Sequence, residues 1–166
     1  MVHSDRIEMG NRIEHNVKVL LFLISALPIL ISSCSFPKIK ILKDPLTPEE
    51  HLNLGVAYEK RGEVDLAIKE YQRAAKKLPL ALLYLGNAHF LKNQWQEAEL
   101  YYRKAIEKDP KNADAYNNLA WLYYSKGENL EEAEALAKKA LALDPSKGPL
   151  YRDTLEKIKE KGKCVE

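Results

Sequence analysis

Small and aromatic residues recur at a near-constant interval between Gly55 and Pro145. The first set is Gly55, Tyr58, Ala67, Tyr71, Ala74 and Pro79. It recurs 31 residues later as Gly86, His89, Ala98, Tyr102, Ala105 and Pro110, and again as Ala120, Tyr123, Ala133, Ala137, Ala140 and Pro145. Each set spans two apolar segments of helical period, separated by Gly62, Asn93 or Gly127, residue types that suit a helix end. The pattern predicts three pairs of helices that approach closely at their small residues.

The order Leu-Gly-x-x-Tyr, Ala-x-x-x-Tyr and Pro, which the later sets keep except at His89, Ala120 and Ala137, resembles the tetratricopeptide repeat, a helix-turn-helix of about 34 residues. The resemblance covers Pro48 to about Pro145 and implies an all-α solenoid whose core forms where neighbouring pairs stack. Thr47 is the expected N-cap of the first helix, with Pro48 at the first helical position and Glu50 completing a capping box. We expect repeats at approximately 48–78, 79–112 and 113–147, a polar capping helix at 148–162 and a tail at 163–166.

Two departures from a regular repeat concern length. The first spacing is 31 residues, and we expect the missing residues between Leu78 and Leu82, which predicts a tight junction and a late start for the next helix. The third repeat carries one extra residue, which we expect in the turn at 127–129. Neither change falls on a packing position.

Two further departures concern side chains. Ala137 stands where the other repeats have a tyrosine, so we expect Tyr151 or Leu155 of the capping helix to supply the missing bulk. In that helix Glu156 falls where a small residue is expected, and no second helix follows. The segment 148–162 is therefore predicted to cap the array rather than to begin a complete fourth repeat.

The resemblance also implies a binding surface, because the first helices of tetratricopeptide arrays line a concave groove. The corresponding positions in this chain are Leu52, Val56, Leu83, Asn87, Phe90, Asn117, Trp121 and Tyr124. They are apolar, aromatic and amide side chains, which suit a protein or peptide partner held by buried aromatic anchors. The alternative for Phe90 and Trp121 is packing against the capping helix or a neighbouring helix. Trp95 is expected in the core.

The groove positions lack the lysine and arginine cluster of those family members that clamp the carboxylate tails of chaperones. The sequence therefore disfavours that kind of partner.

The N-terminal third has a different pattern. Val19 to Ile31 is a 13-residue apolar run without charge, within the range of about 7 to 15 for a signal-peptide core and short of a bilayer span. Ile31-Ser32-Ser33-Cys34 then resembles the lipobox of bacterial lipoprotein precursors. The resemblance implies a signal peptide at 1–33, cleavage and lipidation at Cys34, and a tether at 34–47, with an uncleaved signal anchor as the alternative. Ser35, in place of Asp, resembles precursors sent to the outer membrane rather than the inner.

The segment before this run has three basic and three acidic residues when counted from Met1, whereas a signal peptide begins with net positive charge. Counting from Met9 leaves Arg12 and Lys18 against Glu14. We therefore expect Met9 to be the true start.

Composition and motifs argue against several classes of function. A net charge of +2, from 26 Lys+Arg against 24 Asp+Glu, lacks the basic excess of nucleic-acid-binding proteins. The sequence shows no phosphate-binding loop, no Ser/His/Asp or Cys/His grouping and no metal-ligand spacing, so it predicts no enzyme, no cofactor and no metal. His51 and His89 occupy packing positions. Cys164 is expected to be an exposed tail thiol; an intermolecular disulfide, and with it a homo-oligomer, is the alternative.

Together these features predict a lipid-anchored scaffold or assembly factor of the bacterial envelope, facing the periplasm and binding a peptide or helix in its groove. Two alternatives remain: a non-catalytic subunit of an envelope enzyme complex, in cell-wall or secretion and pilus machinery, and an enzyme whose site the sequence does not reveal.

Overall fold

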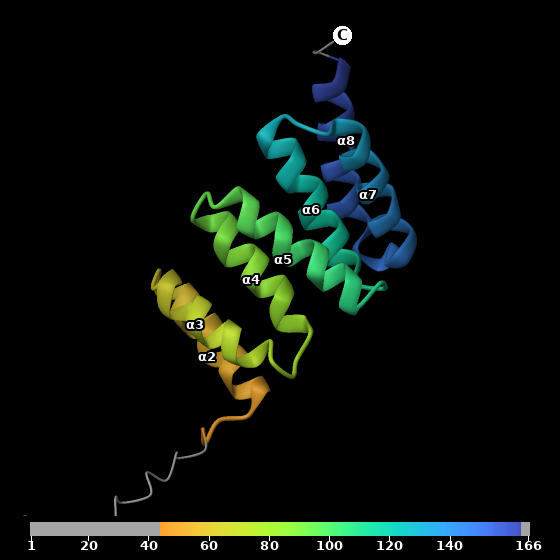
Figure 1. The fold of residues 1–166 in the computed structure, drawn as a ribbon. Coiled ribbons are helices and arrows are strands. Elements are labelled where there is room, and N and C mark those ends of the chain that lie inside the picture. The colour runs from red at the N-terminus through yellow and green to blue at the C-terminus, as the bar shows by residue number, and fades with distance from the viewer. Residues whose placement is uncertain (1–43, 164–166) are drawn as a thin grey trace, which may run out of the picture. The chain divides into compact units, whose positions relative to one another are not determined.

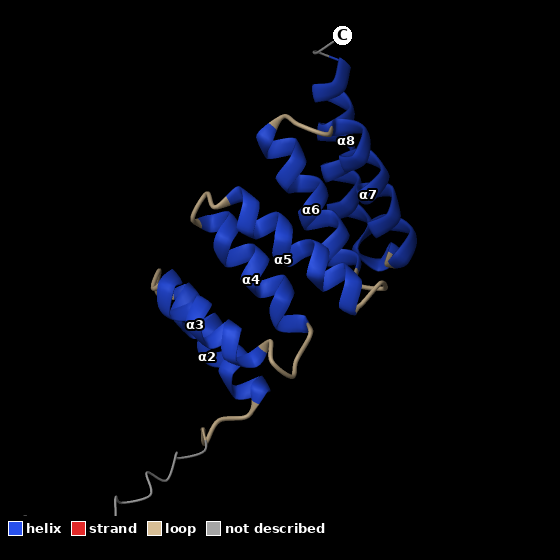
Figure 2. Cartoon of the chain, viewed as in Figure 1, coloured by secondary structure: helices blue, strands red, loops and turns tan. Residues whose placement is uncertain are grey.

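A computed structural model describes residues 44–163 of the chain. Over this range the chain is helical, with a short 3-10 turn and no strand (Figure 2). The helices are α2 (Pro48–Lys60), α3 (Val64–Ala74), α4 (Leu80–Leu91), α5 (Trp95–Lys108), α6 (Ala113–Lys126), α7 (Leu130–Leu143), η2 (Pro145–Lys147) and α8 (Gly148–Lys163). The predicted signal peptide, the Cys34 anchor, most of the tether, the start at Met9 and the Cys164 thiol lie outside the described residues.

The helices pack as three successive pairs, which confirms the predicted all-α repeat array. α2 packs on α3, α4 on α5 and α6 on α7, and the pairs are joined by contacts of α3 with α4 and of α5 with α6 (Figure 1). α8 packs on α6 and α7 and ends the described array, as the predicted capping helix. Within residues 44–163, no helix has the length and apolar character needed to cross a bilayer.

Inside each of the first two pairs, a glycine lies directly against a tyrosine ring. A Cβ atom added to Gly55 or to Gly86 would lie 2.4 Å from the ring of Tyr71 or Tyr102, inside van der Waals contact. The third pair has Ala120 and Ala137 at these two positions, and both are fully buried. The pairs therefore use two complementary combinations, glycine with tyrosine and alanine with alanine.

The predicted helix ends are confirmed. Thr47 Oγ1 accepts a hydrogen bond from the Glu50 backbone N–H, and the Glu50 carboxylate accepts one from Thr47, so the capping box is complete. The turns inside the pairs place Gly62, Asn93 and Gly127 at positive φ. In the third repeat two residues, instead of one, separate the first positive-φ residue, Gly127, from the next helix, and the second of them, Asn129, adopts a φ of 53°.

The shortened first repeat differs from the prediction. α3 ends seven residues after Ala67, whereas α5 and α7 end ten residues after Ala98 and Ala133. The three missing residues are therefore absent from the end of α3, and the loop at 75–79 is longer than the loop at 109–112, so the predicted tight junction is wrong. The predicted late start is correct: α4 begins six residues before Gly86, and α2 begins seven before Gly55.

The capping helix resembles a first helix more closely than predicted. The assignment of Glu156 to the small position is wrong, because Glu156 is exposed whereas Thr154 is buried. Tyr151, fully buried, precedes Thr154 by three residues, and Leu83 precedes Gly86 by the same distance. Tyr151 Oη also donates a hydrogen bond to Asp114 Oδ1 at 2.8 Å, which ties α8 to α6.

The expected replacement for the tyrosine missing at Ala137 comes from α8. Leu155 and Ile158 lie in the same core cluster as Ala137, and Tyr151 lies in a neighbouring cluster with Ala140. The capping helix therefore fills the last layer with its own side chains.

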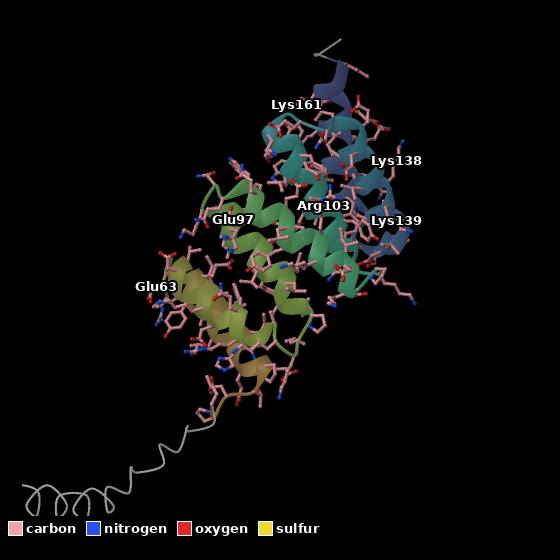
Figure 3. The ribbon with its side chains drawn as sticks, in the orientation of Figure 1. Glu63, Glu97, Arg103, Lys138, Lys139 and Lys161 are labelled. Atoms are coloured by element: carbon pink, nitrogen blue, oxygen red, sulfur yellow. The ribbon has the colours of Figure 1, made fainter. Side chains whose placement is uncertain are left out.

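Arg103 links the second and third pairs on the face formed by α5, α6 and α7 (Figure 3). Its guanidinium donates to Glu99 and to Glu132, each at 3.0 Å, and to the hydroxyl of Tyr123. Partial burial alone would raise the pKa of Glu99, but hydrogen bonds from Tyr123 and Arg103 hold that pKa below its usual value. Glu99 therefore stays ionised at neutral pH and keeps this link closed.

Candidate functional site

A cavity of about 270 Å³ opens among α2, α4 and α6, the first helices of the three pairs, and we call it the first-helix groove. It lies toward the C-terminal ends of these helices. α2 contributes Glu59 to its wall, α5 contributes Tyr102 at its base, and the remaining lining residues come from α4 and α6: Asn87, Phe90, Leu91, Asn118 and Trp121.

Three of the eight predicted groove residues line this cavity: Asn87, Phe90 and Trp121. Val56 is partly buried and packs against the core cluster of the first pair. Tyr124 is partly buried in the α6–α8 contact, where Lys161 Nζ donates to its carbonyl oxygen at 2.7 Å (Figure 3).

The prediction is wrong for Leu52, Leu83 and Asn117, which are only 6 to 8% exposed. Each lies three residues before the small residue of its helix, on the stripe that faces neighbouring helices. These side chains belong to the core and are not available to a partner.

Four lining residues were missed: Glu59, Leu91, Tyr102 and Asn118. For Glu59 the sequence held a signal, because it lies four residues after Gly55, as Phe90 lies four after Gly86. The other three have no counterpart among the predicted groove positions.

Hydrogen bonds fix the polar floor of the groove. Asn87 Oδ1 accepts from the Tyr102 hydroxyl at 3.0 Å and from Asn118 Nδ2 at 2.9 Å. Burial raises the pKa of Tyr102, so its hydroxyl stays neutral and remains a donor. Among residues 44–163, no partner is found for Asn87 Nδ2 or Asn118 Oδ1. The two amides therefore present one donor and one acceptor to the cavity, the complement of a peptide group.

Aromatic side chains form the apolar walls. The rings of Phe90 and Trp95 pack edge to face, with 5.2 Å between their centres. Trp95 is partly buried against the core, as expected. Trp121 packs against Tyr124, with 4.9 Å between the two ring centres. Lys157 Nζ of α8 lies 5.3 Å from the centre of the Trp121 ring. The two interpretations of Trp121 therefore both apply, because it contacts the capping helix and lines the cavity. Leu91 is 57% exposed at the rim.

A larger hollow of about 430 Å³ lies between the N-terminal end of α7 and the C-terminal half of α8. Its carboxylate Glu134 already contacts two cations, Lys138 at 2.7 Å and Lys159 at 4.0 Å. Cations of the chain itself therefore already surround this carboxylate, and the first-helix groove, where aromatic and unpaired polar groups converge, is the better candidate site.

The two histidines pack as predicted. His51 is 4% exposed, with Nδ1 2.6 Å from Glu70 and Nε2 3.1 Å from Asp44. His89 Nδ1 lies 2.7 Å from Gln94, and its ring stacks on Tyr101. No group of three or more His, Cys, Asp or Glu side chains in the described part of the chain has a geometry that suits a metal ion.

Replacing Asn117 by leucine should raise the free energy of unfolding by about 1 kcal/mol. Asn117 Oδ1 is buried and has no hydrogen-bond partner among the described residues, whereas leucine occupies the equivalent positions 52 and 83. Urea unfolding of wild type and Asn117→Leu measures the difference. A less stable variant would show that Oδ1 is satisfied in solution.

Two family models described as tetratricopeptide repeat match the chain, one over residues 41–81 and 52–113, the other over 101–135. Together they span residues 41–135, more than half of the chain.

Among curated proteins, Hsp70-Hsp90 organizing protein 1 of Glycine max is 32% identical over 139 residues, which cover 78% of this chain and 23% of that protein. Protein O-mannosyl-transferase TMTC2 of Homo sapiens is 30% identical over 118 residues, which cover 64% of this chain and 14% of that protein. The chain therefore spans less than a quarter of either relative.

Two solved structures share the fold. The first tetratricopeptide domain of Spaghetti (RPAP3), bound to the HSP90 peptide SRMEEVD, superposes with a TM-score of 0.63 at 23% identity, covering 72% of this chain and 96% of that one. The TPR2B domain of yeast Sti1 in complex with pHsp70 superposes with a TM-score of 0.65 at 21% identity, covering 69% and 97%. At these identities the likeness concerns the fold alone.

Proposed function

This chain belongs to the tetratricopeptide-repeat family, and we propose that it is a protein-interaction module whose first-helix groove holds a peptide segment of a partner protein. The observation that carries the proposal is the Asn87–Asn118 pair, which offers a donor and an acceptor between the side chains of Phe90 and Trp121. Amides recognise a peptide backbone of any sequence, and aromatic anchors supply most of the binding energy at such sites.

The partner differs in kind from the acidic peptide SRMEEVD that occupies the related RPAP3 domain. A groove that binds such a peptide needs cations to pair with its carboxylates. The lining of this groove holds one charged side chain, the carboxylate of Glu59. An acidic peptide would therefore be repelled here.

Affinity capture from detergent-solubilised envelope tests the proposal. The variant Phe90→Ala/Trp121→Ala should lose the partners that wild type retains, because it removes both aromatic walls. The matched control is Leu66→Ala/Leu100→Ala, which removes two exposed leucines from the second helices α3 and α5 and should retain them. Identical partners for wild type and the groove variant would refute the proposal, provided that both variants melt cooperatively.

We further propose that the module is a lipoprotein of the bacterial envelope, anchored through Cys34 and facing the periplasm from the outer membrane. The apolar run Val19–Ile31 and the lipobox-like Ile31-Ser32-Ser33-Cys34 support this. Wild type should incorporate a clickable fatty-acid analogue and Cys34→Ala should not. Equal labelling of both would exclude lipidation at Cys34.

The identity of a partner obtained by affinity capture separates two roles of the module. A partner that is a cell-wall or secretion enzyme would favour the role of a complex subunit over that of an assembly factor.

A further inference from the structure

Glu59 is a carboxylate without a compensating cation. Among residues 44–163 it takes part in no ion pair, although two other carboxylates, the buried Glu70 and the partly buried Glu99, have an arginine nitrogen within 3.0 Å. Its one hydrogen bond comes from the Tyr71 hydroxyl, which donates to Oε2 at 2.9 Å. Tyr71 therefore orients the carboxylate, and Oε1 remains available in the wall of the groove.

The surroundings of Glu59 suit a cationic side chain with a long apolar stem. Phe90, Leu91 and Trp121 line the same cavity and offer surface for methylene groups and for the face of a guanidinium. Asn118 Oδ1 adds a neutral acceptor. Arginine can use both acceptors because its planar fork carries several donors, whereas the ammonium of lysine is a single, strongly hydrated point.

Building on the proposed function, we infer that the partner segment carries a basic residue, preferably arginine, whose guanidinium pairs with Glu59 while its stem lies against Phe90 and Leu91. A segment that covered the cavity without a cation would bury an unpaired carboxylate, which is costly. The charge of Glu59 thus selects among peptides that the amide pair and the aromatic walls accept alike.

Selection from a phage-displayed random-peptide library tests this inference. Four immobilised proteins are compared: wild type, Glu59→Gln, Phe90→Ala/Trp121→Ala, and the control Glu97→Gln. Glu97 is an exposed carboxylate of α5 (Figure 3) that does not line the groove. Wild type and Glu97→Gln should enrich peptides that combine arginine with apolar residues. Glu59→Gln should keep the apolar enrichment and lose the preference for arginine. Thermal melting shows that each variant is folded.

A synthetic version of the peptide most enriched on wild type then measures the pairing. Exchange of its arginine for citrulline, which is uncharged and of nearly the same shape, should weaken binding to wild type about tenfold, or about 1.4 kcal/mol. The same exchange should leave binding to Glu59→Gln unchanged. Fluorescence anisotropy of the labelled peptides gives the four dissociation constants.

The outcomes separate the two proposals. Peptides that are enriched equally on Phe90→Ala/Trp121→Ala, or no enrichment at all, would overturn the groove as a peptide site and this inference with it. Groove-dependent peptides without a basic residue, or an equal effect of citrulline on wild type and Glu59→Gln, would overturn the pairing with Glu59 alone.

Discussion

Exchange of Gly86 for alanine should destabilise the protein, and the same exchange should stabilise it once Tyr102 has been replaced by alanine. In wild type the new methyl group would lie 2.4 Å from the Tyr102 ring, which is 2% exposed and has no room to move away. Overpacking of this kind costs about 1 to 3 kcal/mol, which exceeds the gain of about 0.8 to 1 kcal/mol in helix propensity.

When the Tyr102 ring is absent, Gly86→Ala causes no overpacking, and only the gain in helix propensity remains. Tyr102→Ala alone should cost about 3 to 5 kcal/mol, because it empties a core position. Gly86→Ala added to that variant recreates the alanine pair that Ala120 and Ala137 already form in the third repeat, and it should recover about 1 kcal/mol. Urea unfolding of the four proteins of this cycle measures the coupling. The same sign of effect in both backgrounds would contradict the close packing of Gly86 and Tyr102.

Removal of the Tyr151 side chain should have an effect of similar size, about 3 to 5 kcal/mol in Tyr151→Ala, because the ring is fully buried between α8 and the last pair. Tyr151→Phe keeps the ring and loses only the hydrogen bond to Asp114, which also contacts Lys147 at 2.6 Å. That variant should lose about 1 kcal/mol.

Hydrogen exchange locates the effect of Tyr151→Ala. Repeat arrays are held by contacts between neighbours, so amides of α8 and α7 should lose protection first, and those of α2 and α3 should keep theirs. A uniform loss of protection along the array would show that α8 is not a separable cap. Unchanged protection in α8 would show that Tyr151 does not anchor it.

The pairing of helices could be predicted because its cause is local. A small residue at Gly55, Gly86 or Ala120 is visible in the sequence, and so is the partner at Tyr71, Tyr102 or Ala137. The capping box at Thr47 and the turn residues are likewise encoded within a few positions. These features therefore appear in the structure where the pattern places them.

The groove was predicted only in part, because its lining depends on how each first helix is rotated against its neighbours. The repeat pattern identifies the helix but leaves neighbouring residues such as Asn117 and Asn118 equivalent. In the structure Asn117 is buried and Asn118 lines the cavity, where it donates to Asn87 on another helix. That contact joins residues 31 positions apart, and no local pattern specifies it.

For the capping helix, the repeat length gives the correct phase and the local apolar pattern does not. A repeat of 34 residues from Ala120 places Thr154 at the small position, and the structure buries it there, whereas the pattern had pointed to Glu156. The 3-10 turn Pro145–Lys147 precedes α8, and Thr154 follows Pro145 by nine residues, whereas Ala120 follows Pro110 by ten. In this phase Tyr151 is buried and its hydroxyl donates a hydrogen bond to Asp114.

The central claim, that the first-helix groove is the binding surface, is tested most directly by NMR. The arginine-containing peptide selected on wild type is titrated into the isotopically labelled protein, and the amide and side-chain NH₂ shifts are followed. The account predicts the largest changes at Glu59, at Leu91, at the indole of Trp121 and at the side-chain amides of Asn87 and Asn118. Changes centred instead on Leu66 and Leu100 of the second helices would contradict it.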